Sequence, residues 1–504
     1  MTLNASSATP DFRQVDVAAL ILRSLHKPAQ ERAIEFRGQW HTWGELRQYG
    51  ERLCALLDEA AVPREAPIGL VVRNRLAHAA VILGLVAARR TVAMVHAFQS
   101  PQAIARDLAK LRAVAVVADD EDWTPAVITE CRRIGTLGVV VSTAEPRVAV
   151  QRELLSPGAG PFAEHPGSAG LQLLSSGTTG TPKRIHLPMR ALARGIVTVS
   201  SIGAADDGNA APAILYWPLG NVSVMSLIAQ SCLGRRMVLL ERFRLDEFLA
   251  TLREHRPNVV AMPPPVIRQV LLAGVPKEAF ASLELVSGGS GPLEPETQEK
   301  FEATYGIPII WRYGATEFAG TLASWSAPLR KQFPSGKRGS VGRALEGTQV
   351  RIVDMQSGAE LPHGAQGFLE GQVSLLGPEW IRTTDIASMD DDGFIYIHGR
   401  SDSAIIRGGF KILPERVVAC LRDHPGVADA AVIGIADAVL GQVPVAVVEQ
   451  RAGGPVPSAD ELEQLVRSRL PAHHVPTRFM VVESLPRTAS LKVSMVDMRK
   501  LIGD

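Results

Sequence analysis

Residues that build disulfide frameworks, zinc sites or base-stacking surfaces are scarce in this sequence. Its 504 residues include four cysteines, with no CxxC pair and no His/Cys spacing typical of metal sites (Cys54, Cys131, Cys232, Cys420). Such scattered cysteines argue against a disulfide framework and fit reduced thiols in a cytoplasm. Aromatic residues make up 5% and the formal net charge is +1, so neither stacking nor a long-range field points to nucleic acid.

Targeting and membrane signals are missing as well. The N-terminal "MTLNASSATPDF" lacks the basic start and apolar core of a secretory signal. The longest apolar run, "HAAVILGLVAA", is shorter than the roughly 20 residues that a helix needs to cross a bilayer, and it is typical of a buried helix. We therefore expect a cytoplasmic protein without a membrane span.

Alternating helix and strand patterns fill the first half of the chain. Helical spacing alternates with short apolar runs (helices 42–60, 76–90 and 101–112; strands 67–72, 91–96 and 113–119). Thr42 is a candidate helix cap, with Glu45 three residues on. The same alternation of strand and helix patterns returns over residues 236–289. Short strands bounded by helices of this length predict βαβ units, largely parallel sheets and an α/β fold.

Two changes of pattern divide the rest of the chain, which is too long for a single core. Gly-rich turns between short alternating strands over 339–400 predict a small, mainly antiparallel β unit. After the turn-rich "GRSDS", strand and helix patterns alternate again for about 100 residues. We expect a large N-terminal domain over 1–400, which includes the β unit, and a small α+β domain over 401–504.

The loop "LLSSGTTGTPK" is suited to holding an anion. Gly177 and Gly180 allow close approach of the backbone, and consecutive N–H groups in such a loop form an anion-binding concavity. Its Ser and Thr hydroxyls add donors, and Lys183 adds a point charge suited to phosphate. The pattern G-x-x-G-x-P-K differs from the Walker P-loop. A flexible Ser/Gly loop is the alternative.

Three further segments carry polar groups that suit a nucleotide. In "YGATE", Tyr313 could stack on a base, Thr316 could donate to a phosphate and Glu317 could reach Mg²⁺, although a capped strand end explains the same residues. Asp385 and Arg400 together could bind a ribose diol, whereas the "DDDG" between them fits a solvated turn better. Lys492 lies in a turn-like stretch, where a lone lysine is usually a surface charge.

Taken in order, these segments resemble the adenylate-forming superfamily, which contains acyl- and aryl-CoA synthetases, adenylation domains of peptide synthetases and firefly-type luciferases. The resemblance spans about residues 30–500 and rests on "SSGTTGTPK", "YGATE", "TTD", "GRSDSAIIRGGFKILPERV" and "LPRTASLK". It implies attack of a carboxylate on the α-phosphate of ATP, with Mg²⁺, to give acyl-AMP and pyrophosphate. A thiol then takes the acyl group, and the small domain rotates on a hinge between the two steps.

By position, the resemblance implies a role for each motif residue. The first loop would hold the β- and γ-phosphates, and four further segments the adenosine (loop Ser175, Ser176, Gly177, Thr178, Thr179, Gly180 and Lys183; adenosine Ser290, Gly291, Pro292, Tyr313, Gly314, Asp385 and Arg400). Catalysis would fall to Thr316 at the α-phosphate, Glu317 as the Mg²⁺ ligand and Lys492 as the adenylation lysine. Asp402 would be the hinge, and Gly408 with Gly409 the loop that approaches the thiol acceptor.

Several positions depart from the family pattern. Thr384 and Leu491 stand where glycine is usual, and the segment before Asp385 is short. Asn221 replaces a common histidine of the acyl pocket, and no Asp lies at 221–223 to hold an α-amino group. We therefore expect a mostly apolar pocket for an aryl or short-to-medium acyl acid, lined by a small set of residues (Trp217, Asn221, Val222, Gly288, Gly289, Tyr313).

Three functions remain open at this point. A freestanding acid–CoA ligase is favoured, and an enzyme that loads the phosphopantetheine of a separate acyl carrier protein is the alternative. A non-catalytic nucleotide-binding protein on the same scaffold is the third, although the retained Lys183, Glu317, Asp385, Arg400 and Lys492 speak against it. A homodimer is possible.

Overall fold

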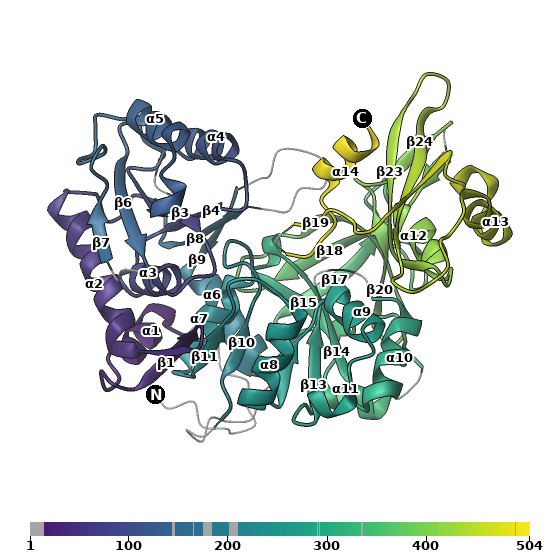
Figure 1. Cartoon of the computed structure of the whole chain (residues 1–504), viewed down its shortest axis with the longest axis horizontal. Helices are drawn as coiled ribbons and strands as arrows, with labels where there is room; N and C mark the ends of the chain where they lie inside the picture. The colour runs from purple at the N-terminus through teal and green to yellow at the C-terminus, as the bar shows by residue number, and fades with distance from the viewer. Residues whose placement is uncertain are drawn as a thin grey trace.

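A computed structural model describes most of the chain (residues 15–143, 147–164, 166–174, 184–200, 210–289, 291, 293–333, 336–408, 410–488 and 490–503, with the side chains of 196–200 excepted). It confirms a mixed α/β fold with a large N-terminal and a small C-terminal domain (Figure 1). The exact boundary at residue 400 stays a prediction. No helix among the described residues is both long enough and apolar enough to span a membrane.

The first layer is a seven-stranded sheet in the order β7-β6-β5-β3-β4-β8-β9. Its five inner strands are parallel, and β7 and β9 run antiparallel at the edges (β3 Ile68–Val72, β4 Val92–His96, β5 Ala115–Asp119, β6 Leu137–Ser142, β7 Arg147–Val150, β8 Gly170–Leu174, β9 Arg184–Pro188). Purely apolar strands such as β3 are buried along their whole length, as expected for a parallel sheet covered on both faces.

Helices cover this sheet (α1 Val17–Leu25, α2 Trp43–Glu59, α3 Leu76–Ala87, α4 Pro101–Leu111, α5 Pro125–Ile134, α6 Met189–Ser200). The capping box predicted at the start of α2 is present, with Thr42 and Glu45 each bonding to the other's backbone N–H. Helices α2 and α3 meet at two glycines, because a Cβ on Gly84 would lie 2.4 Å from the Cα of Gly50. Apolar α3 is buried on all sides.

Two further sheets complete the central body. One has the order β10-β11-β1-β2 and the other the order β12-β13-β14-β15-β16. Helices pack beside them (strands β1 Arg32–Phe36, β2 Gln39–Thr42, β10 Ala213–Leu215, β11 Met237–Leu239, β12 Val259–Ala261, β13 Leu285–Gly288, β14 Ile309–Ala315, β15 Gly320–Ser324 and β16 Arg343–Ala344; helices α7 Val224–Cys232, α8 Leu245–His255, α9 Pro264–Leu272, α10 Pro295–Tyr305 and α11 Ala327–Gln332). Strands β12, β13 and β14 are parallel, so their carboxyl ends share one edge.

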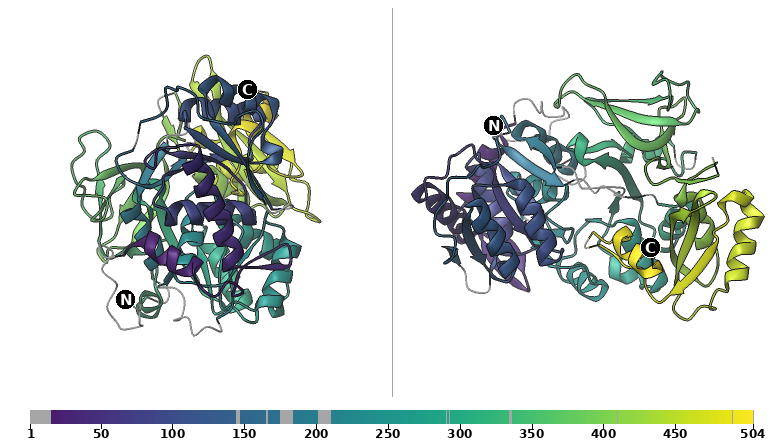
Figure 2. Two further views of the ribbon diagram at one scale, coloured as in Figure 1. Left: turned by 90° about the vertical axis from the view of Figure 1, so that its left-hand side faces the viewer. Right: turned by 90° about the horizontal axis from the view of Figure 1, so that it is seen from above.

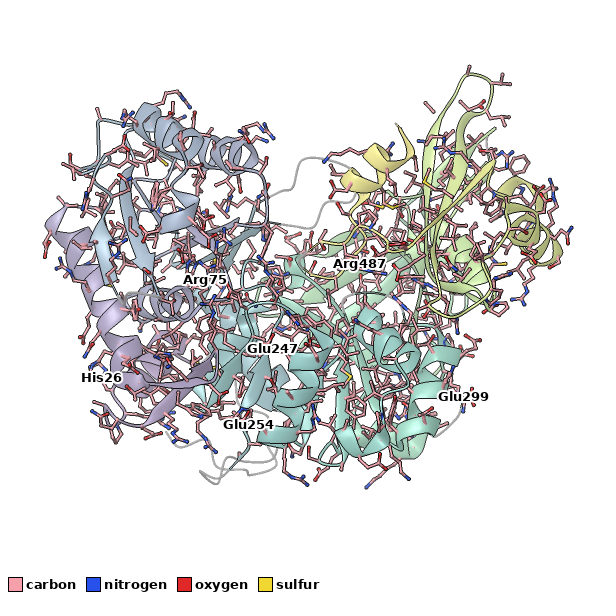
Figure 3. The ribbon with its side chains drawn as sticks, in the orientation of Figure 1. His26, Arg75, Glu247, Glu254, Glu299 and Arg487 are labelled. Carbon is pink, nitrogen blue, oxygen red and sulfur yellow. The ribbon has the colours of Figure 1, made fainter. Side chains whose placement is uncertain are left out.

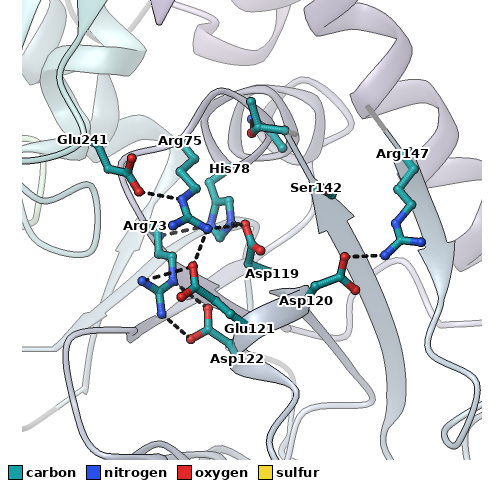
Figure 4. A network of polar contacts seen from close by, with 12 residues as sticks. Arg73, Arg75, His78, Asp119, Asp120, Glu121, Asp122, Ser142, Arg147 and Glu241 are labelled. Atoms are coloured by element: carbon teal, nitrogen blue, oxygen red, sulfur yellow. Dashed lines mark hydrogen bonds and ion pairs between the residues drawn. The ribbon is translucent and has the colours of Figure 1, made fainter. Parts of the chain in front are cut away.

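An ionic network joins the first layer to the central body (Figure 4). Arg75 pairs with Asp119 at 2.9 Å and, through its Nε, with Glu241 just after β11 at 2.7 Å. Arg73 pairs with buried Asp122 at 2.7 Å. The turn after β3 is thereby fixed against two separate sheets.

The β unit and the small domain follow. Strands β17 to β20 form a four-stranded sheet with every pairing antiparallel (β17 Thr348–Val353, β18 Gly367–Val373, β19 Ile381–Met389, β20 Ile395–Arg400). The small domain has a sheet with cores of its own (β21 Ile405–Arg407, β22 Phe410–Ile412, β23 Val427–Asp437, β24 Gly441–Gln450, β25 Arg478–Val482, α12 Pro414–Arg422, α13 Ala459–Arg469, α14 Met495–Ile502). Seen from above, this domain and the N-terminal half lie at opposite ends of the molecule (Figure 2).

Candidate active site

The candidate site lies where parallel strands of the central body end. Gly288 closes β13, and the "YGATE" segment runs from the end of β14 into a single 3₁₀ turn at Thr316–Phe318. Ligands of open α/β sheets bind at such carboxyl edges. A Cβ on Gly314 would lie 2.1 Å from the carbonyl oxygen of Gly320, so glycine is required where β14 and β15 approach each other.

Tyr313, Asp385 and Arg400 meet at this edge. Asp385 and Arg400 are opposite each other on β19 and β20, and the Tyr313 hydroxyl donates a hydrogen bond to the Asp385 carboxylate. Burial raises the pKa of Asp385, while the bond from Tyr313 and the charge of Arg400 oppose that shift. Burial and the neighbouring Asp385 raise the pKa of Tyr313. The phenol stays neutral and orients a carboxylate that can accept hydrogen bonds from a diol.

Arg400 is held from its other side. Its guanidinium donates to Asp402 at 2.9 and 2.7 Å and to the Thr384 hydroxyl at 2.7 Å. The hydrogen bond to Asp402 and the charges of Asp385 and Asp402 raise the pKa of Arg400 against the effect of burial. Thr384, which stands at a usual glycine position, thus supplies an acceptor for the guanidinium. The residue predicted as the hinge, Asp402, bonds directly to the residue predicted to hold ribose.

Lys492 is brought to the same place from the small domain. It lies in a tight turn in which the Thr488 N–H donates to the Lys492 carbonyl at 2.7 Å. Lys492 is exposed as a residue, and its ammonium is partly desolvated. That desolvation and repulsion from Arg400 lower the pKa of Lys492, while Asp385 opposes them. A cation of the small domain therefore faces the ribose-binding candidates of the large one.

Leu491 fixes this turn on the large domain. Its φ of 61° lies in the left-handed region, which a residue with a side chain rarely adopts. The Leu491 side chain packs against the central core of the large domain. Leu491, which stands where the family usually has glycine, thus combines a strained backbone with an apolar side chain that packs on the large domain.

Thr316 and Glu317 are presented by the 3₁₀ turn. Glu317 is exposed, and its carboxylate makes no hydrogen bond or ion pair within the part of the chain that the structure describes. Mg²⁺ is commonly bound by one or two carboxylates together with phosphate oxygens, so the Glu317 carboxylate is a suitable Mg²⁺ ligand. The turn itself is held by buried Arg194 of α6, which donates to the Phe318 and Thr321 carbonyls at 2.9 and 2.7 Å. No motif in the sequence points to Arg194.

The predicted acid-binding segment is anchored by a residue that the sequence did not single out. Buried Asn74 donates to the Trp217 carbonyl at 2.9 Å and accepts from the Leu219 N–H at 2.9 Å. The Asn221 side chain bonds within its own segment, where its Oδ1 accepts a hydrogen bond from the Ser223 N–H at 3.0 Å. His96 at the end of β4 packs against Gly220 of this segment. A Cβ on Gly220 would lie 2.6 Å from the Nδ1 of His96.

Some predicted positions are not brought into contact with the site, and others lie outside the described residues. Gly408 bonds to the Leu440 carbonyl at 2.7 Å within the small domain. Gly288 is covered by the Trp311 ring, which a Cβ would approach to 1.9 Å. Val222 packs against the hydrophobic core around the seven-stranded sheet, and Gly291 is exposed. The anion loop and three single positions lie outside the described residues (Ser175–Lys183, Ser290, Pro292, Gly409).

A buried ionic network crosses the domain boundary near the lysine turn. Arg268 and Glu294 belong to the large domain, and Arg422, Asp429 and Arg487 to the small one. Arg422 pairs with Glu294 across the boundary and with Asp429 at 2.7 Å. Arg487, which Figure 3 labels where the last segment meets the large domain, pairs with Asp429 at 2.7 Å. Despite burial, these arginines hold the pKa of Asp429 well below its usual range.

Comparison with known proteins identifies the family models and relatives that this chain matches. A model of the AMP-binding enzyme family matches residues 22–379, and a model of the AMP-binding enzyme C-terminal domain matches residues 419–492. The 4-coumarate–CoA ligase 3 of Oryza sativa subsp. japonica is 25% identical, over 92% of this chain and 87% of its own. The sulfoacetate–CoA ligase of Cupriavidus necator is 32% identical, over 65% of this chain and 66% of its own.

Solved structures share the fold. The o-succinylbenzoate CoA synthetase from Bacillus subtilis, in complex with its acyl-adenylate intermediate, superposes with a TM-score of 0.76 at 21% identity. The match covers 96% of this chain and 98% of that one.

Proposed function

Because the chain belongs to the AMP-binding enzyme family, we propose that it activates a carboxylic acid with ATP and passes the acyl group to a thiol. The first step gives acyl-AMP and pyrophosphate, and CoA is the favoured acceptor in the second. The resemblance seen in the sequence is thereby confirmed at the level of the family. One observation carries the proposal: the turn that holds Lys492 packs on the large domain through Leu491, close enough to Asp385 and Arg400 for their charges to act on the pKa of Lys492.

Each residue has a definite task in this proposal. Asp385 accepts hydrogen bonds from the ribose hydroxyls, with Tyr313 fixing the carboxylate and Arg400 beside it. The Lys492 ammonium faces the α-phosphate, where charge builds as the carboxylate attacks, and a fixed cation there stabilises the transition state. Thr316 donates to the same phosphate. Glu317 would hold Mg²⁺, which neutralises phosphate charge when bound.

The second step needs a different arrangement of the small domain. In the structure the charges of Asp385 and Arg400 act on the pKa of Lys492, while Gly408 bonds within its own domain, to the Leu440 carbonyl. We propose that the small domain turns about the Asp402 region after adenylation and brings the Gly408–Gly409 loop to the site. A lysine on a mobile domain can then serve one half-reaction and leave for the other.

The acceptor and the cellular setting are part of the proposal. The names of the related CoA ligases support CoA, and a freestanding carrier-loading enzyme is the alternative. Four unpaired cysteines support a cytoplasmic setting. A homodimer is the proposed assembly, which light scattering tests. A nucleotide-binding protein without catalysis would show no acid-dependent exchange at all.

Acid-dependent ATP–pyrophosphate exchange tests the first half-reaction. Purified protein with ATP, Mg²⁺ and labelled pyrophosphate is given a panel of aryl, fatty and hydroxy acids, one at a time. Active acids are then incubated with CoA or with candidate carrier proteins to see which becomes acylated. Exchange that stays at the acid-free background across the panel contradicts the proposal.

A further inference from the structure

Arg312 is a partly buried cation that the proposed mechanism does not use. It lies on β14 between Trp311 and Tyr313, in a strand that is otherwise apolar up to the nucleotide site. Its Nη2 is fully buried, and its guanidinium has no hydrogen bond or ion pair with any residue that the structure describes. Burial alone lowers the pKa of Arg312 to about 10, so the side chain still carries its charge at neutral pH.

The surroundings of Arg312 place it beside the predicted acid pocket. A Cβ on Gly289 would lie 3.7 Å from the Cβ of Arg312 and 3.0 Å from its carbonyl oxygen. Gly289 directly follows β13, at the edge where the nucleotide candidates gather. Trp311, the preceding residue on β14, is buried and covers Gly288, so alternation along the strand sends Arg312 to the other face.

A comparison with Arg194 shows what Arg312 lacks. Burial lowers the pKa of Arg194 to about 10 as well, but its guanidinium donates to two backbone carbonyls. Arg194 is thus a satisfied structural residue. Leaving a buried guanidinium without partners costs several kcal/mol, so buried charges are normally paired. Arg312 has neither a carbonyl nor a carboxylate to offset that cost within the described residues, which points to an acceptor supplied by a ligand.

A second hydrogen-bond donor, in the predicted acid pocket, is also buried without a partner among the described residues. The indole N–H of Trp217 is buried and has no hydrogen-bond partner among the described residues. Trp217 follows β10, and Tyr216 beside it bonds to the carbonyl of Ala261 on β12, the strand next to β13. Trp217 therefore follows β10, beside β12, and Arg312 lies within β14, which β13 separates from β12, in a region that the sequence predicts to be mostly apolar.

We propose that Arg312 determines acid specificity by binding a second anionic group, a carboxylate or sulfonate, on the part of the acid remote from the reacting carboxylate. This inference rests on the proposed function and narrows its substrate class to acids that carry two negative charges. A guanidinium recognises such groups with paired hydrogen bonds. The Trp217 N–H, which also lacks a partner among the described residues, would add a neutral donor.

Matched pairs of acids test this directly. Wild-type protein, Arg312→Met and Arg312→Lys are assayed by pyrophosphate exchange with dicarboxylic acids, aryl and aliphatic, and with the monomethyl ester of each. For the wild type we expect kcat/KM to favour the diacid over its half-ester. Arg312→Met should lower that ratio about 10- to 150-fold, the usual range for losing hydrogen bonds to a charged group. Arg312→Lys should restore part of it.

Ligand-induced thermal shifts provide a readout that does not depend on turnover. Arg312→Met removes an unpaired buried charge, so its melting temperature without acid should equal or exceed that of the wild type. The diacid should raise the wild-type melting temperature and leave that of Arg312→Met unchanged, while ATP raises both. A variant that melts lower than the wild type and no longer responds to ATP would contradict the assignment of Arg312 to the acid alone.

The failure of this inference differs from the failure of the proposed function. If half-esters or plain monocarboxylic acids are exchanged as well as diacids, and Arg312→Met leaves the ratio unchanged, the second anionic group is excluded while adenylation stands. If the wild type exchanges pyrophosphate with no acid of the panel, both are overturned.

Discussion

Glu294→Gln should loosen the small domain from the large one. Glu294 directly precedes α10 in the large domain, and its carboxylate pairs with Arg422 of the small domain. The side chains are 17% and 19% exposed, so solvent screens this pair only in part. Glutamine keeps the shape of glutamate and removes its charge. Arg422 keeps its bonds to Asp429, so the substitution acts mainly on the contact across the boundary.

The size of the effect follows from the kind of bond that is lost. A hydrogen bond to a charged group contributes about 1.5–3 kcal/mol, which corresponds to about a 10- to 150-fold change in an equilibrium constant. Arg268 also pairs with Glu294 at 3.2 Å and loses a charged partner, so the upper half of that range is the better guide. The equilibrium for docking of the small domain should fall by that factor.

Hydrogen–deuterium exchange of the lysine turn measures how far the small domain has loosened from the large one. Amides of the lysine turn, residues 487–493, should lose protection by about the same factor as the docking equilibrium, whereas amides of the seven-stranded sheet should not change. Adenylation should slow, and thioester formation from supplied acyl-AMP should keep its rate or gain. Glu463→Gln is the matched control, because its pair with Arg467 at 2.6 Å is exposed and lies within α13.

Two results would refute this reasoning. One is unchanged protection of the turn in Glu294→Gln, and the other is an equal loss in Glu463→Gln. A double-mutant cycle with Arg422→Gln isolates the pair, since the coupling vanishes if the two side chains act independently.

Two further predictions concern stability. Burial disfavours the Asp119 carboxylate, but the His78 ring at 3.6 Å and the hydrogen bond from Arg75 prevail and lower the pKa of Asp119 from 3.8 to about 2. The charged form therefore stabilises the fold above pH 3.8, and this contribution is lost as the pH falls towards 2. Asp119→Asn should lower the free energy of unfolding by about 2 kcal/mol at pH 7 and by less at pH 3, in urea titrations. Leu491→Gly should be less destabilising than Leu491→Ala by about 1 kcal/mol, because only glycine adopts the left-handed backbone freely; the reverse order would contradict the strain at Leu491.

The sequence predicts most of the local structure because local patterns carry that information. Apolar periodicity and turn residues locate helices and strands such as α2 and β3, and the Thr42–Glu45 box is a short-range device that the structure contains as expected. The motif order also predicts that Asp385 and Arg400 belong together. Their cross-strand pairing supplies the physical reason, since antiparallel β19 and β20 bring them opposite each other.

Contacts between distant parts of the chain could not be predicted in the same way. Arg194 meets the 3₁₀ turn from 124 positions away, and Arg422 meets Glu294 across 128 positions. Nothing in the residues near either arginine indicates such a partner. Arg312 left a weak signal, because a charged residue inside "IIWRYGA" interrupts an apolar strand. Whether it is satisfied depends on the packing of neighbouring strands, which only the fold reveals.

Pyrophosphate exchange by Lys492→Ala tests the central claim most directly. The variant should lose acid-dependent exchange, because the cation facing the α-phosphate is gone, and should still form thioester from supplied acyl-AMP. Wild-type protein with the same acid serves as the reference for both half-reactions. Normal exchange in Lys492→Ala would contradict the claim that this lysine of the small domain completes the adenylation site.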